Sequence, residues 1–159
     1  IAAEAPAWQT PCRIVLGATA AEETGGFGAR VLAEKVRPDL AVVLDTTYAS
    51  EEQDVRLGSG PVLTLSDASV LLSPALRDRV LGLMAEARVP LQTEVYNFSG
   101  TDARAFPQQG LSCPVLPVLV PTLGNHSPCE TADQRDLDAW LAAVRAIAEK
   151  GFALTERPE

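Results

Sequence analysis

Apolar and polar positions follow one another along the chain in blocks that predict strands alternating with helices. Cys12–Ala20 is a mostly apolar run, typical of a strand covered on both faces, and Gly26–Val36 has the composition of a helix. The later blocks predict strands at about 39–45, 62–66, 91–96 and 114–121. They also predict helices at about 73–87 and 132–150, and a short helix that follows the turn-rich segment 97–103 and ends at about 109. This alternation predicts a layered α/β fold with a largely parallel sheet flanked by helices.

Proline and glycine positions refine three of these elements. Ser73 and Pro74 suit the start of a helix, and Gly151 suits the residue that ends one. The prolines within 114–121 favour an edge strand or an irregular strand start, because proline cannot donate a hydrogen bond to a sheet.

Length and composition fit a single globular domain. The chain has 159 residues, of which 47% are hydrophobic and 21% charged, enough for a proper core. We expect the domain to span 12–151, with flexible ends at 1–11 and 152–159. No apolar run is long enough to span a bilayer, and no signal-peptide pattern precedes the first predicted strand.

Charge and cysteine content narrow the classes of partner and compartment. The formal net charge of −8 disfavours nucleic acid and anionic membranes as partners, and it is compatible with binding cations. Cys12, Cys113 and Cys129 are an odd number without C-x-x-C spacing, so a disulfide framework is not expected. A reducing compartment, the cytoplasm, fits this pattern.

Acidic residues and the single histidine fall where predicted strands end. Glu22 and Glu23 follow the first predicted strand, Asp45 ends the second, and His126 lies in the loop at 122–131. Ligands of open α/β sheets bind at such strand ends. Carboxylates and an imidazole are ligands for zinc, cobalt or manganese, and a neighbouring carboxylate that is not a ligand can act as general base.

Each of these residues also has a structural explanation. Glu22 and Glu23 precede a predicted helix, where the helix dipole stabilises acids. Asp45 is equally suited to a turn, His126 to a surface loop, and Gly-Thr-Asp-Ala at 100–103 to a helix cap. Local sequence alone therefore leaves both interpretations open.

Four segments, taken together, match a known family. They read Ala-Glu-Glu-Thr-Gly-Gly-Phe-Gly-Ala at 21–29, Val-Val-Leu-Asp-Thr-Thr at 42–47, Gly-Thr-Asp-Ala-Arg-Ala at 100–105 and His-Ser-Pro-Cys-Glu at 126–130. In this order and spacing, the chain resembles the glutamyl aminopeptidase and tetrahedral aminopeptidase family of two-metal, zinc-type exopeptidases. The Glu-Glu pair is shared across a wider clan, whereas the last two segments narrow the resemblance to this family.

The resemblance implies a role for each candidate residue. Glu22 would be the general base, Glu23 and His126 would bind one metal ion, and Asp45 would bind the other. The resemblance implies two divalent metal ions as cofactors. Zinc is the expected metal, with cobalt or manganese as alternatives. Peptides are implied as substrates, and a homo-oligomer as the assembly of the complete enzyme. Roles in orienting ligands or positioning substrate are implied for Asp102 and Glu130.

The chain also departs from the family pattern. It lacks the family's early His-x-Asp element, the Asp that bridges both metals, and the inserted small β-domain. We therefore expect a partial three-layer, zinc-peptidase-like sandwich that corresponds to the C-terminal part of the catalytic domain. Alone it should hold metal weakly or not at all and show little activity, and its partner would be the missing N-terminal catalytic segment. Exposed apolar sheet edges should favour self-association or pairing with that segment.

Other interpretations fit less well. A dinucleotide site is disfavoured because Val31 occupies the third glycine position after Gly26-Phe-Gly28, and two acids adjoin the turn. A serine hydrolase is disfavoured because no G-x-S-x-G motif is present. The remaining alternative is a truncated, non-catalytic α/β module that keeps an acidic cation-binding pocket.

Overall fold

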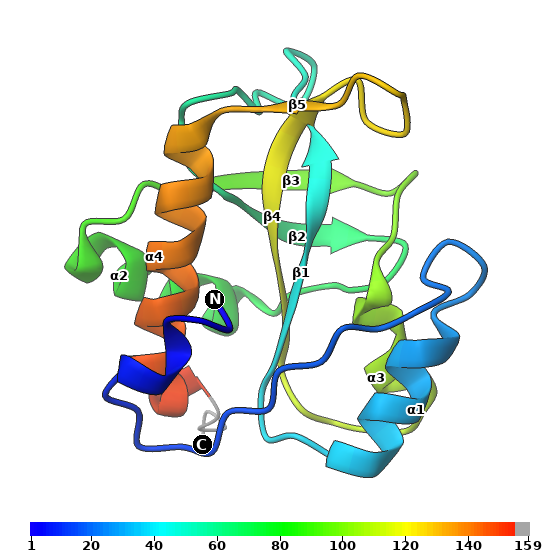
Figure 1. The fold of residues 1–159 in the computed structure, drawn as a ribbon, viewed down its shortest axis with the longest axis vertical. Coiled ribbons are helices and arrows are strands. Elements are labelled where there is room, and N and C mark those ends of the chain that lie inside the picture. The colour runs from blue at the N-terminus through cyan, green and yellow to red at the C-terminus, as the bar shows by residue number, and fades with distance from the viewer. Residues whose placement is uncertain (155–159) are drawn as a thin grey trace.

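The structure, a computed structural model, describes residues 1–154 as a mixed α/β fold with a central sheet flanked by helices (Figure 1). This confirms the predicted fold class. The helices are α1 (Phe27–Val36), α2 (Pro74–Ala87), α3 (Ala105–Gln108) and α4 (Gln134–Lys150). The strands are β1 (Ala41–Tyr48), β2 (Val62–Asp67), β3 (Gln92–Tyr96), β4 (Val115–Leu123) and β5 (Thr131–Ala132). Short 3-10 turns are η1 (Ala5–Ala7), η2 (Asp102–Arg104) and η3 (Gly151–Leu154).

The sheet consists of two parallel pairs joined by a short antiparallel contact. Its strand order is β1-β4-β2-β3, with β5 paired to β4. β1 runs parallel to β4 along its whole length, and β2 runs parallel to β3. β2 meets β4 antiparallel at Val62–Leu119 and Leu63–Val118. Figure 1 shows why this contact is short, since β2 and β3 cross the direction of β1 and β4.

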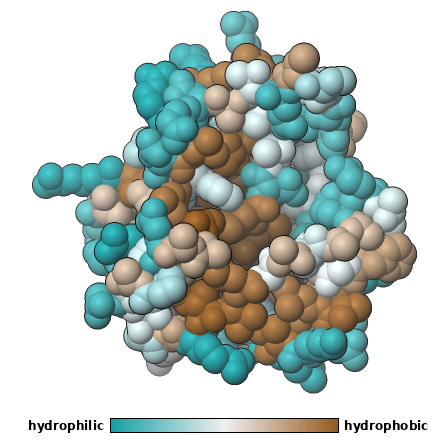
Figure 2. Space-filling model, in the orientation of Figure 1, coloured by the Kyte–Doolittle hydropathy of each residue, from teal (hydrophilic) through white to brown (hydrophobic). Residues whose placement is uncertain are grey.

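The first predicted strand is wrong. Residues 12–20 are extended but form no strand ladder in the described chain, and all of them are exposed. The side chains of Ile14, Val15 and Leu16 are 37%, 46% and 50% exposed. An apolar run predicts burial, but it does not supply the partner strand that would achieve it. Figure 2 shows the resulting apolar area on the face where this segment passes β1.

The expectation that the proline-rich strand lies at an edge is also wrong. β4 lies between β1 and β2, and Pro117 and Pro121 are fully buried. The carbonyls of Pro114 and Thr122 accept hydrogen bonds from the amides of Ala41 and Ala49. The backbone N–H and C=O groups of the even-numbered residues of β4 therefore point toward β1. The odd-numbered prolines therefore direct their nitrogen toward the β2 side, where the ladder is two residue pairs long. The two backbone N–H groups that these prolines lack therefore remove few hydrogen bonds from the sheet.

The main core lies between the sheet and helices α2 and α4. As predicted, Ser73 caps α2 and accepts from the amide of Leu76 at 3.2 Å. The predicted α2 stripe packs into the core, and burying each large apolar side chain contributes roughly 1.5–3 kcal/mol. Its members are Val80, Leu83 and Met84, with Leu76 packed beside them. Across from them, Trp140 of α4 donates from Nε1 to the carbonyl of Val118 at 2.7 Å.

Parts of both predicted flexible ends touch the domain. The side chain of Trp8 is buried, as is that of Leu154 in η3, while residues 155–159 lie outside the described part of the chain. The flexibility of the ends and the domain bounds 12–151 stay predictions. Within residues 1–154, none of the helices combines the length and apolar character needed to cross a membrane.

A buried carboxylate ties the start of α4 to the loop before β2. Asp136 is completely buried, and its two oxygens accept from the amides of Gly58 and Gly60, both at 2.7 Å. Asp133 caps the same helix by accepting from the amide of Arg135 at 2.8 Å. Asp136 therefore fixes where the chain enters β2.

We expect Asp136→Ala to lower the free energy of unfolding by about 3 kcal/mol, because the buried amide of Gly60 and the partly buried amide of Gly58 both lose their carboxylate acceptor. The matched control is Asp138→Ala, an exposed position on the same helix, which should change stability by less than about 0.5 kcal/mol. Urea denaturation followed by circular dichroism measures both. Equal effects of the two substitutions would contradict this assignment.

Candidate active site

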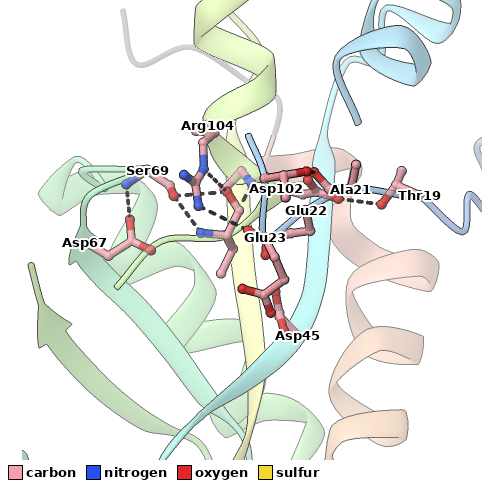
Figure 3. Close-up of polar contacts among 12 residues, drawn as sticks. Thr19, Ala21, Glu22, Glu23, Asp45, Asp67, Ser69, Asp102 and Arg104 are labelled. Atoms are coloured by element: carbon pink, nitrogen blue, oxygen red, sulfur yellow. Dashed lines mark hydrogen bonds and ion pairs between the residues drawn. The ribbon is translucent and has the colours of Figure 1, made fainter. Parts of the chain in front are cut away.

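The structure brings the predicted site residues to one region of the molecule. Glu22 and Glu23 lie in the turn before α1, Asp45 lies in β1, and Asp102 begins η2 (Figure 3). Nδ1 of His126, in the loop after β4, is 3.6 Å from Oε1 of Glu23. Glu23 and His126, which are 103 positions apart in the sequence, are therefore neighbours in space.

Hydrogen bonds join the His126 loop to β1 beside Asp45. Asn125 donates from Nδ2 to the hydroxyl of Thr46 at 3.0 Å and to that of Thr122 at 3.2 Å. Thr122 in turn donates to Oε1 of Glu130 at 2.8 Å. Glu130 thus contacts the strand that carries the loop, and Asn125 sets the spacing between the imidazole and Asp45. The sequence offered no signal for Asn125 beyond its place next to the histidine.

Left-handed backbone conformations occur immediately beside both halves of the site. Ala21 has φ 62° and His126 has φ 60°, backbone angles that residues other than glycine seldom adopt. Each costs roughly 1–3 kcal/mol and persists because the surrounding contacts impose it. The turn thereby presents the two glutamates, and the loop presents the imidazole, at fixed positions.

The glycine-rich turn shows that neither glutamate caps α1. The N-cap is Gly26, in the left-handed region, and its turn forms when the Glu22 carbonyl accepts from the amides of Gly25 and Gly26. Within the described residues, no acidic side chain lies in the first turn of α1. The glutamate side chains instead point toward Asp45 and Asp102 (Figure 3).

Arg104 forms an ion pair with one of the two glutamates. Its guanidinium lies 3.1 Å from Oε1 of Glu22 and donates from Nε to the carbonyl of Thr101 at 2.9 Å. Burial raises the pKa of Glu22, the charge of Asp45 raises it further, and Arg104 opposes both. Arg104 belongs to the Gly-Thr-Asp-Ala-Arg-Ala motif, but local sequence gave no sign of this pair because its partner is 82 residues away.

Asp102 links the acidic cluster to the extended segment 12–20. Its Oδ2 accepts from the hydroxyl of Thr19, while Oδ1 is buried without a hydrogen-bond partner among the described residues. Burial raises the pKa of Asp45; the amide of Thr46 opposes this, and the charges of Asp102 and Glu23 add to the increase. The acidic cluster therefore contains more carboxylates than the neighbouring cationic side chains can neutralise.

The donor set fits part of a metal site. Two ligands of one tetrahedral zinc lie roughly 3.3 Å apart, close to the 3.6 Å between Glu23 and His126. The partnerless oxygen of Asp102 and the uncompensated charge around Asp45 also suit a cation nearby. In the part of the chain that the structure describes, however, no three such side chains are arranged to hold one ion together.

A hollow of about 350 Å³ opens beside these residues. It is lined on one side by Glu22, Glu23, His126 and Arg104. A larger hollow of about 520 Å³ lies elsewhere, next to Gln53 and Arg56, and neither the paired acids nor the imidazole line it. Of these two hollows, the smaller one therefore adjoins the candidate residues.

A buried carboxylate lies beneath this region, on β3. Glu94 is 3% exposed and accepts from the hydroxyls of Thr64 and Thr47, both at 2.7 Å. Burial raises the pKa of Glu94; the two hydroxyls oppose the shift and the charge of Asp67 adds to it. Sequence alternation placed this residue in a strand but gave no sign that a glutamate would be buried.

Solved structures similar to this chain include aminopeptidases. A TET aminopeptidase from a marine-sediment thaumarchaeon matches with a TM-score of 0.76 and 28% identity, over 84% of this chain and 39% of its own. The Pyrococcus horikoshii TET1 peptidase, which can assemble into a tetrahedron or a large octahedral shell, matches with a TM-score of 0.72 and 31% identity, over 80% and 38%.

The family model of the M42 glutamyl aminopeptidases matches residues 2–142, and the chain belongs to that family. Among curated relatives, the lysyl aminopeptidase of Pyrococcus furiosus is 31% identical over 86% of this chain and 40% of its own length. A putative aminopeptidase of Acetivibrio thermocellus is 29% identical over 82% and 40%. The chain thus spans about 40% of the length of these relatives. The resemblance stated from the four motifs is confirmed.

Gly28 tests how tightly the acid-bearing turn is packed. A Cβ at this position would lie 2.5 Å from the nitrogen and 2.6 Å from the oxygen of Ala20, both backbone atoms. We expect Gly28→Ala to lower the free energy of unfolding by about 1–3 kcal/mol. Gly82→Ala, where a Cβ meets nothing within 4 Å on helix α2, should instead raise it by about 0.5–1 kcal/mol. Thermal unfolding distinguishes the two, and similar effects would contradict the close approach.

Glu94 should make stability depend on pH. Its pKa in the folded chain is raised above the ordinary 4.5, so the folded state favours the protonated form, and this contribution is lost as pH rises through the raised pKa. We expect wild type to lose stability relative to Glu94→Gln as the pH rises from the ordinary pKa of 4.5 through the raised pKa of the folded chain. Urea denaturation across this range measures the difference. Glu86→Gln, exposed on α2, is the control, and a constant difference for Glu94→Gln would contradict the assignment.

Proposed function

We propose that the chain carries the general base and part of the metal-ligand set of an aminopeptidase that removes N-terminal residues from peptides. The observation that supports this most is the convergence of Glu22, Glu23, Asp45 and His126 from three separated segments on one acidic region. Membership of the aminopeptidase family and the hollow beside these residues add to it.

The proposed roles follow the geometry. Glu23 and His126 would hold one divalent ion, zinc first with cobalt or manganese as alternatives, and Asp45 would contribute to a second. When bound, such ions polarise the scissile carbonyl and activate a water. Asp102, with its unpartnered oxygen, and Glu130, through Thr122, would keep the ligands and substrate in position.

Glu22 would be the residue that moves the proton. Burial and the neighbouring Asp45 raise its pKa, which brings a carboxylate closer to the basicity that a general base needs. It would take a proton from the attacking water and pass it to the nitrogen of the leaving amine. Arg104 would hold the carboxylate in place from the opposite side and limit the rise in its pKa.

The incomplete ligand set supports weak activity for the 159 residues alone. Two side chains on one ion leave open positions, and family members are more than twice as long as this chain. In the complete enzyme, we propose a homo-oligomer in the cytoplasm, by analogy with the assemblies of TET1 peptidase. The second candidate is a non-catalytic module with a residual cation pocket, favoured by the absence of a three-ligand cluster in residues 1–154.

Metal titration and a chimera distinguish the two candidates. We expect the chain to bind Zn²⁺ or Co²⁺ weakly by calorimetry, and His126→Ala and Glu23→Gln to abolish that binding, because each removes one of two adjacent ligands. Joined to the remaining part of the Pyrococcus furiosus lysyl aminopeptidase, the chain should hydrolyse aminoacyl p-nitroanilides. Glu22→Gln should lower kcat by about 10²–10⁴-fold with the metal content unchanged.

Glu34→Gln, an exposed glutamate on α1, is the control in both assays. Hydrolysis that survives Glu22→Gln or chelation would contradict the proposed mechanism. Weak metal binding without hydrolysis in the chimera would favour the non-catalytic module.

A further inference from the structure

Three aromatic side chains form a continuous row along the hollow beside the acids. We call Tyr48, Tyr96 and Phe98 the aromatic row; all three line the hollow. The ring centroids of Tyr48 and Tyr96 are 5.9 Å apart at 73°, and those of Tyr96 and Phe98 are 6.1 Å apart at 67°. The ring of Tyr48 lies 6.5 Å from that of His126. The row therefore leads from the imidazole outward.

Backbone contacts hold the outer end of the row in an exposed position. The carbonyl of Tyr96 accepts from the amide of Ser99 at 3.2 Å, which closes a turn around Phe98. The amide of Ala68 donates to the carbonyl of Ser99 at 2.9 Å and anchors this turn to the loop after β2. Phe98 is 92% exposed as a result. An aromatic ring held in water at the mouth of a hollow favours a ligand that covers it.

The charged side chains of the hollow already have partners across it. Glu22 pairs with Arg104, whose Nε also donates to the carbonyl of Thr101, and Glu23 faces His126. An acidic substrate side chain would meet two carboxylates and a guanidinium that is already engaged. The aromatic row thus offers a ligand ring surfaces to contact beside the candidate catalytic residues.

Resting on the function proposed above, we propose that the aromatic row receives the side chain of the substrate's N-terminal residue and selects aromatic and other large apolar side chains over acidic ones. Edge-to-face packing leaves ring surfaces open to a further ring at about 4.5–7 Å. The carboxylates that line the same hollow would attract the substrate's ammonium group. The side chain would then lie along the row.

Binding of amino-acid amides to the whole 159-residue chain tests this assignment. The probes are L-phenylalaninamide, the α-amide of L-glutamate, L-lysinamide and glycinamide, followed by NMR shifts of the aromatic rings. We expect phenylalaninamide to bind tightest of the four. Phe98→Ala should weaken its binding by roughly threefold to tenfold and leave glycinamide unchanged.

Phe27→Ala is the matched control. Phe27 is also an exposed phenylalanine, but it lies beside Arg30 and outside the lining of the hollow, so its removal should leave all four affinities unchanged. Tighter binding of the glutamate amide, or of lysinamide through a cation–π contact with the rings, would overturn the proposed selectivity. Equal effects of Phe98→Ala and Phe27→Ala would overturn the role of the row.

The chimera described above separates a failure of this inference from a failure of the proposed function. Hydrolysis of every p-nitroanilide with a preference for glutamate or lysine would refute the aromatic selectivity while aminopeptidase activity stands. Aromatic selectivity in binding without any hydrolysis would refute the proposed function, and with it the assignment of the row to a peptide's N-terminal residue.

Discussion

The parallel pairing of β1 with β4 is the constraint on which the candidate site depends. It runs in register from Ala41–Val115 to Tyr48–Thr122, so the end of β4 and its following loop lie directly beside the second half of β1. Asp45 and His126 are 81 positions apart in the sequence, yet this ladder brings their segments together. The hydrogen bond from Asn125 to Thr46 then fixes the loop on the strand.

The acidic cluster gives that arrangement its chemical character. Four carboxylates lie close enough to influence one another's ionisation, and one guanidinium and one imidazole lie against them. Repulsion among the acids favours an arrangement in which a cation or a proton is shared between them. The same region therefore accounts for both proposed properties, the affinity for divalent ions and the presence of a base of raised pKa.

The sequence predicted most helices and strands but not the long-range contacts. α2 and α4 follow from caps and apolar periodicity, which are local properties, and the four motifs identified the family. Residues 12–20 were mistaken for a paired strand because hydropathy does not reveal a partner. Thr19 with Asp102 and Arg104 with Glu22 are joined across 83 and 82 positions, and no local pattern encodes such pairs. Likewise, nothing near Glu94 indicated that Thr47 and Thr64 would surround it.

The two prolines inside β4 have a consequence for the uniqueness of the sheet. A strand that can shift by two residues against its neighbour keeps its facing side chains and can adopt several pairings. On the β2 side of β4, every such shift would need an amide hydrogen where Pro117 or Pro121 has none. The missing amide hydrogens therefore favour one register between β2 and β4. This register in turn sets the positions of the loops that carry the acids and the imidazole.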